Sequence, residues 1–291
     1  MYQAVTARVA AGVPYHVAVA IELPARGYAI RPVFNWRPPT LTWLNALAPS
    51  PAWGQAGLWA LGLTVIGLWT VAIGTRIPRV TVAGAIVVAL ATVAVLYTED
   101  VIYLHEVWAG LLIAASLASW SLRRHTLSIV LGLFAMLFRE LAVPYVVVMA
   151  VLALTESRRR EAIAWAAALS VFACFWMWHL SQILANMPAE GLRNQWLVAG
   201  GWPFALAASR SSVFLMLLPA WIVAILVPIS WAGFWHWTDA TGRRAAMVLT
   251  AYFLMFMLVG RADNWYWGFL VAPLIPLGFF GYFFDPARTR A

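Results

Sequence analysis

The order of charged and apolar segments is the feature that most constrains the fold of this chain. All nineteen basic residues are arginines, and short segments rich in arginine alternate with short segments rich in Glu, Asp and His. Apolar runs separate the two kinds of segment. This alternation is typical of a chain that crosses a lipid bilayer many times and keeps its arginines on one side. It therefore predicts a membrane fold and also the side on which the acidic groups lie.

The composition agrees with a membrane protein. The chain is 64% hydrophobic and 10% charged, whereas soluble domains carry about 25% charged residues. A bilayer admits only helices or closed barrels, and the apolar runs are continuous rather than alternating. We therefore predict an all-α, polytopic transmembrane helical protein with the lipid bilayer as a partner. The net charge of +8 comes from arginines that flank apolar runs, so it does not indicate a nucleic-acid partner.

About eight to nine membrane segments are predicted after residue 52, including a short broken hairpin at 126–155. Seven prolines interrupt residues 1–52, so we predict an external or interfacial segment there, with a short helix at 3–11, and a transmembrane helical domain over 53–291. The predicted spans besides the hairpin are 53–74, 80–97, 107–120, 162–184, 213–235, 245–259 and 266–284.

Residues 126–155 contain two apolar pieces separated by Arg139 and Glu140. A single helix through both pieces would be about 45 Å long, much longer than the hydrocarbon core of a bilayer. A hairpin places the arginine triplet at 158–160 on the same side as the arginine pair at 123–124, as the positive-inside rule prefers. We therefore expect a hairpin whose tip, Arg139 and Glu140, lies within protein below the outer surface.

One topology satisfies every short loop after residue 75. The side assigned as cytoplasmic holds Arg76, Arg79, Arg123, Arg124, Arg158, Arg159, Arg160, Arg243, Arg244, Arg288 and Arg290. The opposite short loops contain only Arg139 and Arg261. Residues 1–52 are then external, which their four arginines do not favour. We expect a missing preceding transmembrane helix; the alternative is a tail held at the interface or on the cytoplasmic side.

The side assigned as external collects the candidate catalytic residues, which are Glu99, Asp100, His105 and Glu106. On one helix that starts near Glu99, positions 99, 103, 106 and 110 share a face. Their carboxylates suit a base acting on a hydroxyl group, or hard oxygen ligands for a divalent cation, although the metal remains unknown. The alternative is that they are solvated acids at a helix entrance.

Candidate substrate-binding residues lie on the same side. Arg139 and Arg261 are the best candidates for anion binding, because a guanidinium can hold a phosphate through two parallel hydrogen bonds. The alternative is structural pairing of these arginines with neighbouring carboxylates. Trp36 is a candidate for stacking on a sugar ring, or else an interfacial anchor. The further candidates are Glu140, Asp263, Asn264, Asn35 and Arg37.

Several short motifs resemble the GT-C superfamily of polytopic glycosyltransferases, especially bacterial members that use polyprenyl-phosphate sugars. They are the Tyr-rich start Tyr2-Gln3-Ala4, Phe34-Asn35-Trp36-Arg37-Pro38-Pro39-Thr40, Thr98-Glu99-Asp100, Leu104-His105-Glu106-Val107-Trp108-Ala109-Gly110, and Leu137-Phe138-Arg139-Glu140 before Pro144. The resemblance implies an enzyme of the bacterial inner membrane whose site faces the periplasm or exterior. Its donor would be a polyprenyl-phosphate sugar, and its acceptor an envelope glycan, lipid or protein.

The resemblance also implies roles for particular residues. Glu99 and Asp100 match by position the acidic residues of the family's second external loop, and Arg139 and Arg261 match the groups that hold the donor phosphate. The family's first external loop carries an acidic catalytic residue near its start. In residues 1–52, however, the only acidic residue is Glu22. We therefore expect the chain to be incomplete or inactive alone. Two other functions stay open: a transporter or flippase for an anionic lipid or solute, and a non-catalytic subunit of envelope assembly.

Overall fold

The computed structural model describes residues 1–74, 76–78, 81–84, 86, 99–195 and 198–284, without the side chains of Glu99 and Val213. The regular elements in these residues are all helices, joined by one isolated β-bridge between Arg31 and Arg193. The prediction of an all-α fold is therefore confirmed. The predicted span at 80–97 falls almost entirely outside the described residues.

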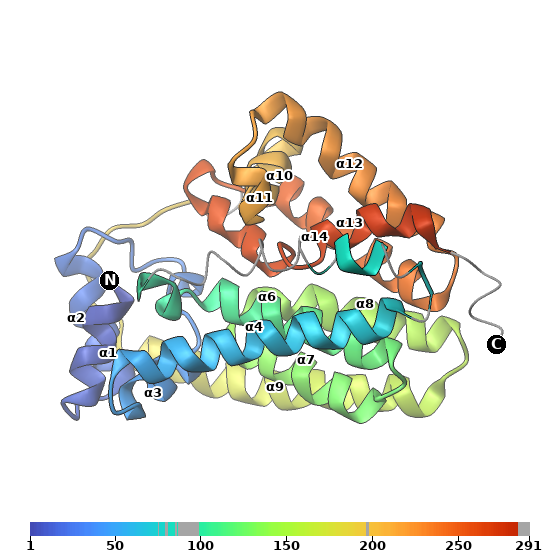
Figure 1. The fold of residues 1–291 in the computed structure, drawn as a ribbon. Helices are drawn as coiled ribbons and strands as arrows, with labels where there is room; N and C mark the ends of the chain where they lie inside the picture. The colour runs from blue at the N-terminus through green and yellow to red at the C-terminus, as the bar shows by residue number, and fades with distance from the viewer. Residues whose placement is uncertain (75, 79–80, 85, 87–98, 196–197, 285–291) are drawn as a thin grey trace.

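The centre of the fold is α6 (His105–Ser121), on which all residues except Trp108 are buried. Figure 1 shows α6 lying along α4 (Pro51–Gly74), α7 (His125–Phe138), α8 (Val143–Thr155) and α9 (Arg159–Asn186), with the C-terminal helices stacked on this layer. α6 packs against α4, α7 and α13 (Ala240–Leu258), and against the 3-10 segment η5 (Ala262–Leu270). Its neighbours cover α6 on every face, so its polar residues as well as its apolar ones are buried in protein.

The broken hairpin expected at 126–155 is present. α7 and α8 contain 14 and 13 residues and are joined through Arg139 and the short 3-10 helix η4 (Glu140–Ala142). Each arm is therefore about 20 Å long, while the 28 residues of α9 extend about 42 Å. The hairpin tip therefore stops short of the end of α9, and Arg139 is only 2% exposed.

Two predicted spans are broken into shorter helices. The apolar stretch at 213–235 is divided into α11 (Val213–Met216) and α12 (Ala220–His236), because Pro219 lacks an N–H and disfavours helix at the residue before it. The last stretch consists of η5 followed by α14 (Ile275–Gly278) and η6 (Phe279–Phe283), with a bend of 61° between them. Between the predicted spans 162–184 and 213–235, residues Gly201–Ser209 form α10.

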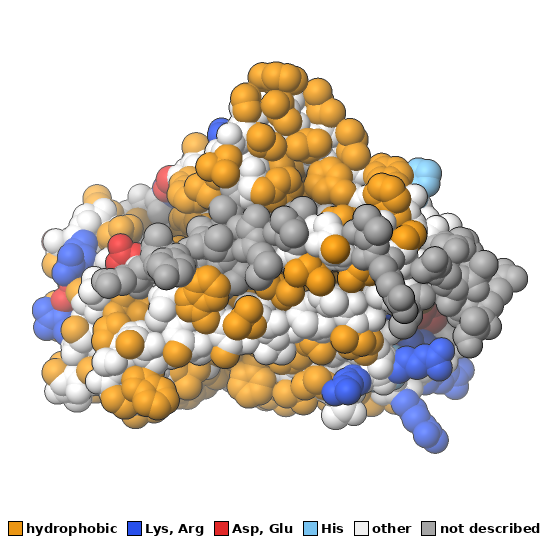
Figure 2. All heavy atoms as spheres, in the orientation of Figure 1, with side chains coloured by type: hydrophobic (Ala, Val, Ile, Leu, Met, Phe, Trp, Pro, Cys, Tyr) orange, Lys and Arg blue, Asp and Glu red, His pale blue; other side chains and the backbone are white. Residues whose placement is uncertain are grey.

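Two described helices, α4 and α9, are long and apolar enough to cross a membrane, and the bent C-terminal pair counts as a third span if it acts as one. This number is smaller than the eight to nine predicted, because α7, α8 and α12 are apolar but short. Figure 2 shows hydrophobic side chains over much of the surface, with arginines gathered toward the two ends of the view. The apolar helices indicate a membrane protein.

One end of the helices is covered by residues 1–50 and 187–195, which we call the cap. The cap contains α1 (Tyr2–Ala10), α2 (Tyr15–Ala25), η1 (Val33–Asn35) and α3 (Thr40–Leu47); only a helix close to α1 was predicted. Its two parts are joined where the backbone N–H of Ile30 donates to the carbonyl of Leu192 at 3.0 Å. The extra length of α9 anchors the cap, because Ile183 belongs to the same buried cluster as Val5 and Trp36.

Two glycines bring η5 to this cap end. A Cβ atom on Gly110 of α6 would lie 2.0 Å from the carbonyl oxygen of Phe269, and one on Gly268 would lie 1.8 Å from that of Ala208. Any larger residue would push the η5 backbone away from α6 and α10. The opposite end of the helices carries the loops with Arg76, Arg123, Arg124, Arg158, Arg159, Arg160, Arg243 and Arg244, and we call it the arginine end.

Candidate functional site

A cavity of about 530 Å³ lies at the cap end, between the cap, the start of α6, the hairpin tip and η5. Among the described residues, half of the predicted site residues line it: Asn35, Arg37, Asp100, Arg139, Asp263 and Asn264. They come from four segments that are distant in the sequence. The fold therefore brings together, in one cavity wall, half of the site residues that the topology had placed on one side.

A buried ionic network forms the floor of this cavity. Glu106, at the start of α6, is fully buried and accepts a hydrogen bond from Nε of Arg139 at 2.8 Å through Oε1. Nη2 of Arg37 lies 3.3 Å from the same oxygen. Nη1 of Arg139 donates to Oε1 of Glu140, its neighbour at the hairpin tip. Two arginines and two glutamates thus offset one another, which is the condition for keeping such charges out of water.

The break in the α7–α8 hairpin creates this geometry. Arg139 has an extended backbone, with φ −151° and ψ 118°, between the last residue of α7 and the 3-10 helix η4. An uninterrupted helix would point Arg139 and Glu140 in directions about 100° apart. The extended residue instead lets one guanidinium contact carboxylates on both η4 and α6.

Aromatic side chains of the cap and of η5 contact Arg37. Its guanidinium carbon lies 4.6 Å from the ring centroid of Tyr2 and 5.4 Å from that of Tyr266, distances typical of cation–π contacts. Burial raises the pKa of Tyr2 to about 12, so its phenol stays protonated. Burial, the largest single effect, would lower the pKa of Arg37, but the charge of Glu106 and the contacts with Tyr2 and Tyr266 together raise it. Arg37 is therefore a permanent cation in the cavity wall.

Asp100 is the free carboxylate of the cavity. It lies in the 3-10 helix η3 (Glu99–Tyr103), is exposed, and has no hydrogen bond or ion pair within the described part of the chain. Asp263, the other acid of the wall, accepts a hydrogen bond from Nε of Arg261 at 2.9 Å. Of these two acids, only Asp100 is thus available to accept a proton from a bound molecule.

The expectation that positions 99, 103, 106 and 110 share one helix face is wrong. η3 ends at Tyr103, Leu104 is extended with ψ 101°, and α6 begins at His105. Asp100 and Tyr103 therefore line the cavity, whereas Glu106 lies beneath it. The side chain of Glu99 lies outside the described part of the structure.

Four other predicted site residues do not line the cavity. Trp36 is fully buried in the cap, where its indole N–H donates to the carbonyl of Ile30 at 2.9 Å, so stacking on a sugar is contradicted by its position. His105 is 1% exposed and packs edge-on against Tyr2. Arg261 lies beside the wall and is paired with Asp263. Glu140 contributes through its contact with Arg139.

Sequence reasoning missed much of the aromatic and amide lining, including Tyr28, Asn194 and Tyr266. Asn194 belongs to the part of the cap that follows α9, and the β-bridge between Arg31 and Arg193 and a hydrogen bond from its backbone N–H to the carbonyl of Arg31 bring it to the site. The described side chains contain no group of three or more His, Cys, Asp or Glu residues that could hold a metal ion. The expected divalent cation therefore has no ligand set within that part of the chain.

Comparison with protein-family models, with curated proteins and with solved structures finds no match to this chain. The function must therefore be argued from the geometry of the cap-end cavity and from the distribution of arginines.

Proposed function

We propose that this chain is a multi-pass protein of the bacterial inner membrane, with the cap end facing the exterior and the arginine end facing the cytoplasm. The arginine distribution supports this orientation, because cytoplasmic loops carry an excess of basic residues. The lengths of α4 and α9 and the apolar surface between the two ends support the membrane location. In this arrangement the shorter apolar helices also lie in the membrane, and the predicted count of eight to nine segments includes 80–97.

We further propose that the cap-end cavity transfers a sugar from a polyprenyl-phosphate donor to a hydroxyl group of a cell-envelope acceptor. The observation that carries this proposal is the presence of a free carboxylate, Asp100, and two arginines, Arg37 and Arg139, in one cavity. A base and an anion-binding group are the two parts that such a transfer needs. A volume of about 530 Å³ is typical of small-molecule sites and suits a sugar phosphate.

The reaction would be a single inverting displacement. Asp100 takes the proton of the acceptor hydroxyl as its oxygen forms a bond to the anomeric carbon of the sugar. The bond between that carbon and the phosphate oxygen breaks, and its electron pair leaves with the polyprenyl phosphate. Arg37 and Arg139 stabilise the negative charge on the departing phosphate.

The hydrogen bonds of Arg139 determine which of its nitrogens is left to bind the phosphate. Nε and Nη1 of Arg139 are held by Glu106 and Glu140, and Nη2 makes no hydrogen bond with any described residue. This nitrogen is the donor left for a ligand. Glu106 contacts both arginines from below, so we propose that it is a positioning residue rather than the base.

A transfer assay tests the proposal. Purified full-length chain in lipid would be mixed with polyprenyl-phosphate hexoses or pentoses and envelope acceptors. Asp100→Asn should lower the transfer rate by about 10² or more, because it removes the base while keeping the shape of the side chain. Glu22→Gln is the matched control, because Glu22 lies in the cap and pairs with Arg8 and Arg26, outside the cavity wall.

The controls separate the possible outcomes. The Glu22→Gln variant should keep the wild-type rate. A folded wild-type chain that transfers no sugar from any donor, or an equal loss in both variants, would contradict the proposal. Movement of an unchanged anionic lipid or solute across vesicles, with no glycosidic bond formed, would favour the transporter instead.

A further inference from the structure

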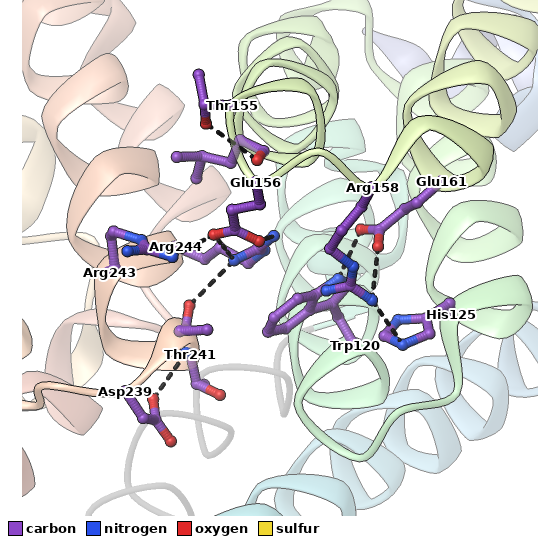
Figure 3. Close-up of polar contacts among 12 residues, drawn as sticks. Trp120, His125, Thr155, Glu156, Arg158, Glu161, Asp239, Thr241, Arg243 and Arg244 are labelled. Atoms are coloured by element: carbon purple, nitrogen blue, oxygen red, sulfur yellow. Dashed lines mark hydrogen bonds and ion pairs between the residues drawn. The ribbon is translucent and has the colours of Figure 1, made fainter.

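A second cavity, of about 470 Å³, lies at the arginine end, far from the proposed transfer site. It is formed by the turn between α6 and α7, the start of α13, and the residues that follow α4 and precede α9. Its described wall contains one carboxylate, Asp239, and three arginines, Arg76, Arg123 and Arg158. Figure 3 shows Trp120, His125, Arg158, Asp239 and Thr241 of this wall, together with the acids and arginines behind it.

The carboxylate of this cavity already accepts three hydrogen bonds. Oδ1 of Asp239 accepts hydrogen bonds from the backbone N–H groups of Thr241 at 2.7 Å and Gly242 at 3.0 Å, which caps the start of α13. Oδ2 accepts from Nε of Arg76 at 2.8 Å. Arg76 is also held at Nη2, which lies 3.4 Å from the carbonyl of Ser121. Asp239 and Arg76 are therefore paired with each other and with backbone groups.

The carboxylates behind the wall are occupied in the same way. Oε1 of Glu161 accepts from the indole N–H of Trp120 at 2.7 Å, and its Oε2 lies 2.8 Å from Nη2 of Arg158. Glu156 holds Arg244, whose guanidinium carbon lies 3.6 Å from the ring centroid of Trp120. These contacts are drawn in Figure 3. They fix the positions of the arginines and leave no free acid beside the cavity.

Two residues of the described cavity wall, His125 and Arg123, keep unused donors. Nε2 of His125 accepts a hydrogen bond from Nη2 of Arg158 at 2.9 Å, and an arginine can only donate. The proton of the neutral imidazole must therefore be on Nδ1, which is buried and has no partner among the described residues. Arg123 lines the cavity, is exposed, and makes no side-chain hydrogen bond or ion pair within the same set. An unpartnered buried donor is costly unless a ligand accepts from it.

We propose that this cavity binds the phosphate of an anionic phospholipid headgroup. A phosphate offers only acceptor oxygens, which match the free donors of Arg123 and His125 and the remaining nitrogens of Arg158. The cavity lies at the ends of α4, α6 and α7, where the headgroups of one leaflet meet a protein that crosses the bilayer. Basic pockets between helices on the cytoplasmic side are suited to such lipids. A lipid is therefore favoured over free phosphate.

Native mass spectrometry of the full chain in detergent tests this site with added phosphatidylglycerol or cardiolipin, and with phosphatidylcholine for comparison. The wild type should retain the anionic lipids preferentially. Arg123→Gln should weaken their binding about tenfold, because it removes charge-assisted hydrogen bonds. Arg124→Gln is the matched control: the neighbouring residue is equally exposed and loses the same charge, but it lies outside the described cavity wall. It should change binding by less than about twofold.

His125→Phe keeps a ring beside Trp120 and removes the buried donor, so it should weaken anionic-lipid binding independently of surface charge. Equal losses in Arg123→Gln and Arg124→Gln would show general attraction to arginines and would overturn the site. Inorganic phosphate that binds as tightly as phosphatidylglycerol would overturn the lipid as the source of the phosphate. Thermal unfolding of each variant confirms that a loss of binding is not a loss of fold.

Discussion

The two cavities are built from the same kinds of side chain and have opposite chemistry. At the cap end, Arg37 and Arg139 are held by the buried carboxylate of Glu106, and Asp100 is left free. At the arginine end, Asp239 caps α13 and pairs with Arg76. Arg123 makes no side-chain hydrogen bond or ion pair with the described residues. The groups left unpaired, rather than the residues present, therefore determine what each cavity can bind.

The two ionic networks also differ in their contact with water. The side chain of Glu106 is 0% exposed, whereas that of Glu156 is 19% exposed and is shared by Arg243 and Arg244. Burial alone would raise the pKa of Glu156, but the hydrogen bonds and charge of its two arginines lower it. The network at the cap end should therefore tolerate the loss of one partner less well than the network at the arginine end.

Removal of one arginine from each network should give the largest difference in stability. Arg139→Met leaves Glu106 and Glu140 short of a buried partner and should lower the free energy of unfolding by about 3–5 kcal/mol. Arg243→Met should cost about 1 kcal/mol or less, because Arg243 is half exposed and Glu156 keeps Arg244. Denaturant unfolding in detergent measures both values. Equal costs would contradict the proposed difference between the two ends.

A smaller loss should follow from a change at the contact between α6 and η5. Gly110→Ala places a Cβ atom 2.0 Å from the carbonyl oxygen of Phe269 and should cost about 1–3 kcal/mol of unfolding free energy. Gly67→Ala is the control, because its Cβ atom would meet nothing within 4 Å in the middle of α4. That variant should be neutral or more stable by up to about 1 kcal/mol. A neutral Gly110→Ala would show that η5 does not need this close approach.

The sequence predicted those elements that a single apolar segment or a single arginine cluster specifies. The lengths of the apolar runs predicted α4, α6 and α9, and the arginine triplet at 158–160 predicted the hairpin of α7 and α8. The same pattern placed Asp100 and Arg139 together. These features depend on local composition and on the energetics of the bilayer, which a single sequence contains.

Other parts of the site depend on contacts between distant segments. The break at Leu104, which separates Asp100 from Glu106, has no proline or glycine to mark it. The contact of Arg37 with Glu106 arises only after the cap packs on the bundle. The cap helices α2 and α3 were missed because prolines flank or interrupt them and because they are covered by distant parts of the chain: α2 packs on α1 and α9, and α3 packs on α1, α4 and α7. Tertiary packing, rather than local pattern, determines these features.

Acidification should modestly lower the stability of the cap and leave the rest of the fold unchanged. Nε2 of His179 donates to the carbonyl of Trp36 at 3.0 Å, so its Nδ1 accepts from Nε2 of His16 at 2.9 Å, and both rings are neutral. Burial, followed by the neighbouring His179, lowers the pKa of His16 from 6.5 to about 4. The contribution of neutral His16 to the stability of the cap is therefore complete above about pH 6.5. It is lost as the pH falls toward 4.

Hydrogen exchange of the α2 amides measures this effect. The amides should exchange faster at pH 5 than at pH 7, after correction for the intrinsic rate, while those of α13 should change little. His16→Gln can still donate to His179 and should weaken the pH dependence. Equal pH effects in α2 and α13 would show that the change is not local to the cap.

The smallest effect is expected at the rim of the cap-end cavity. The pair of Arg261 and Asp263 is largely exposed, with 59% of the Asp263 side chain accessible. Arg261→Gln should therefore lower the free energy of unfolding by no more than about 1 kcal/mol, as for other exposed pairs. The same denaturant experiment checks this value. A loss as large as that of Arg139→Met would show that the rim is part of the buried network.

The central claim is that the two cavities lie on opposite sides of a membrane, with Asp100 outside. The only cysteine, Cys174, lies in α9, so Cys174→Ser provides a cysteine-free background. Single cysteines would replace Gln3 in the cap-end cavity and Arg124 at the arginine end, and a membrane-impermeant maleimide would be added to intact cells or right-side-out vesicles. We predict labelling at position 3 without permeabilisation and at position 124 only after it. Labelling of both positions from the same side, or the reverse pattern, would contradict the account.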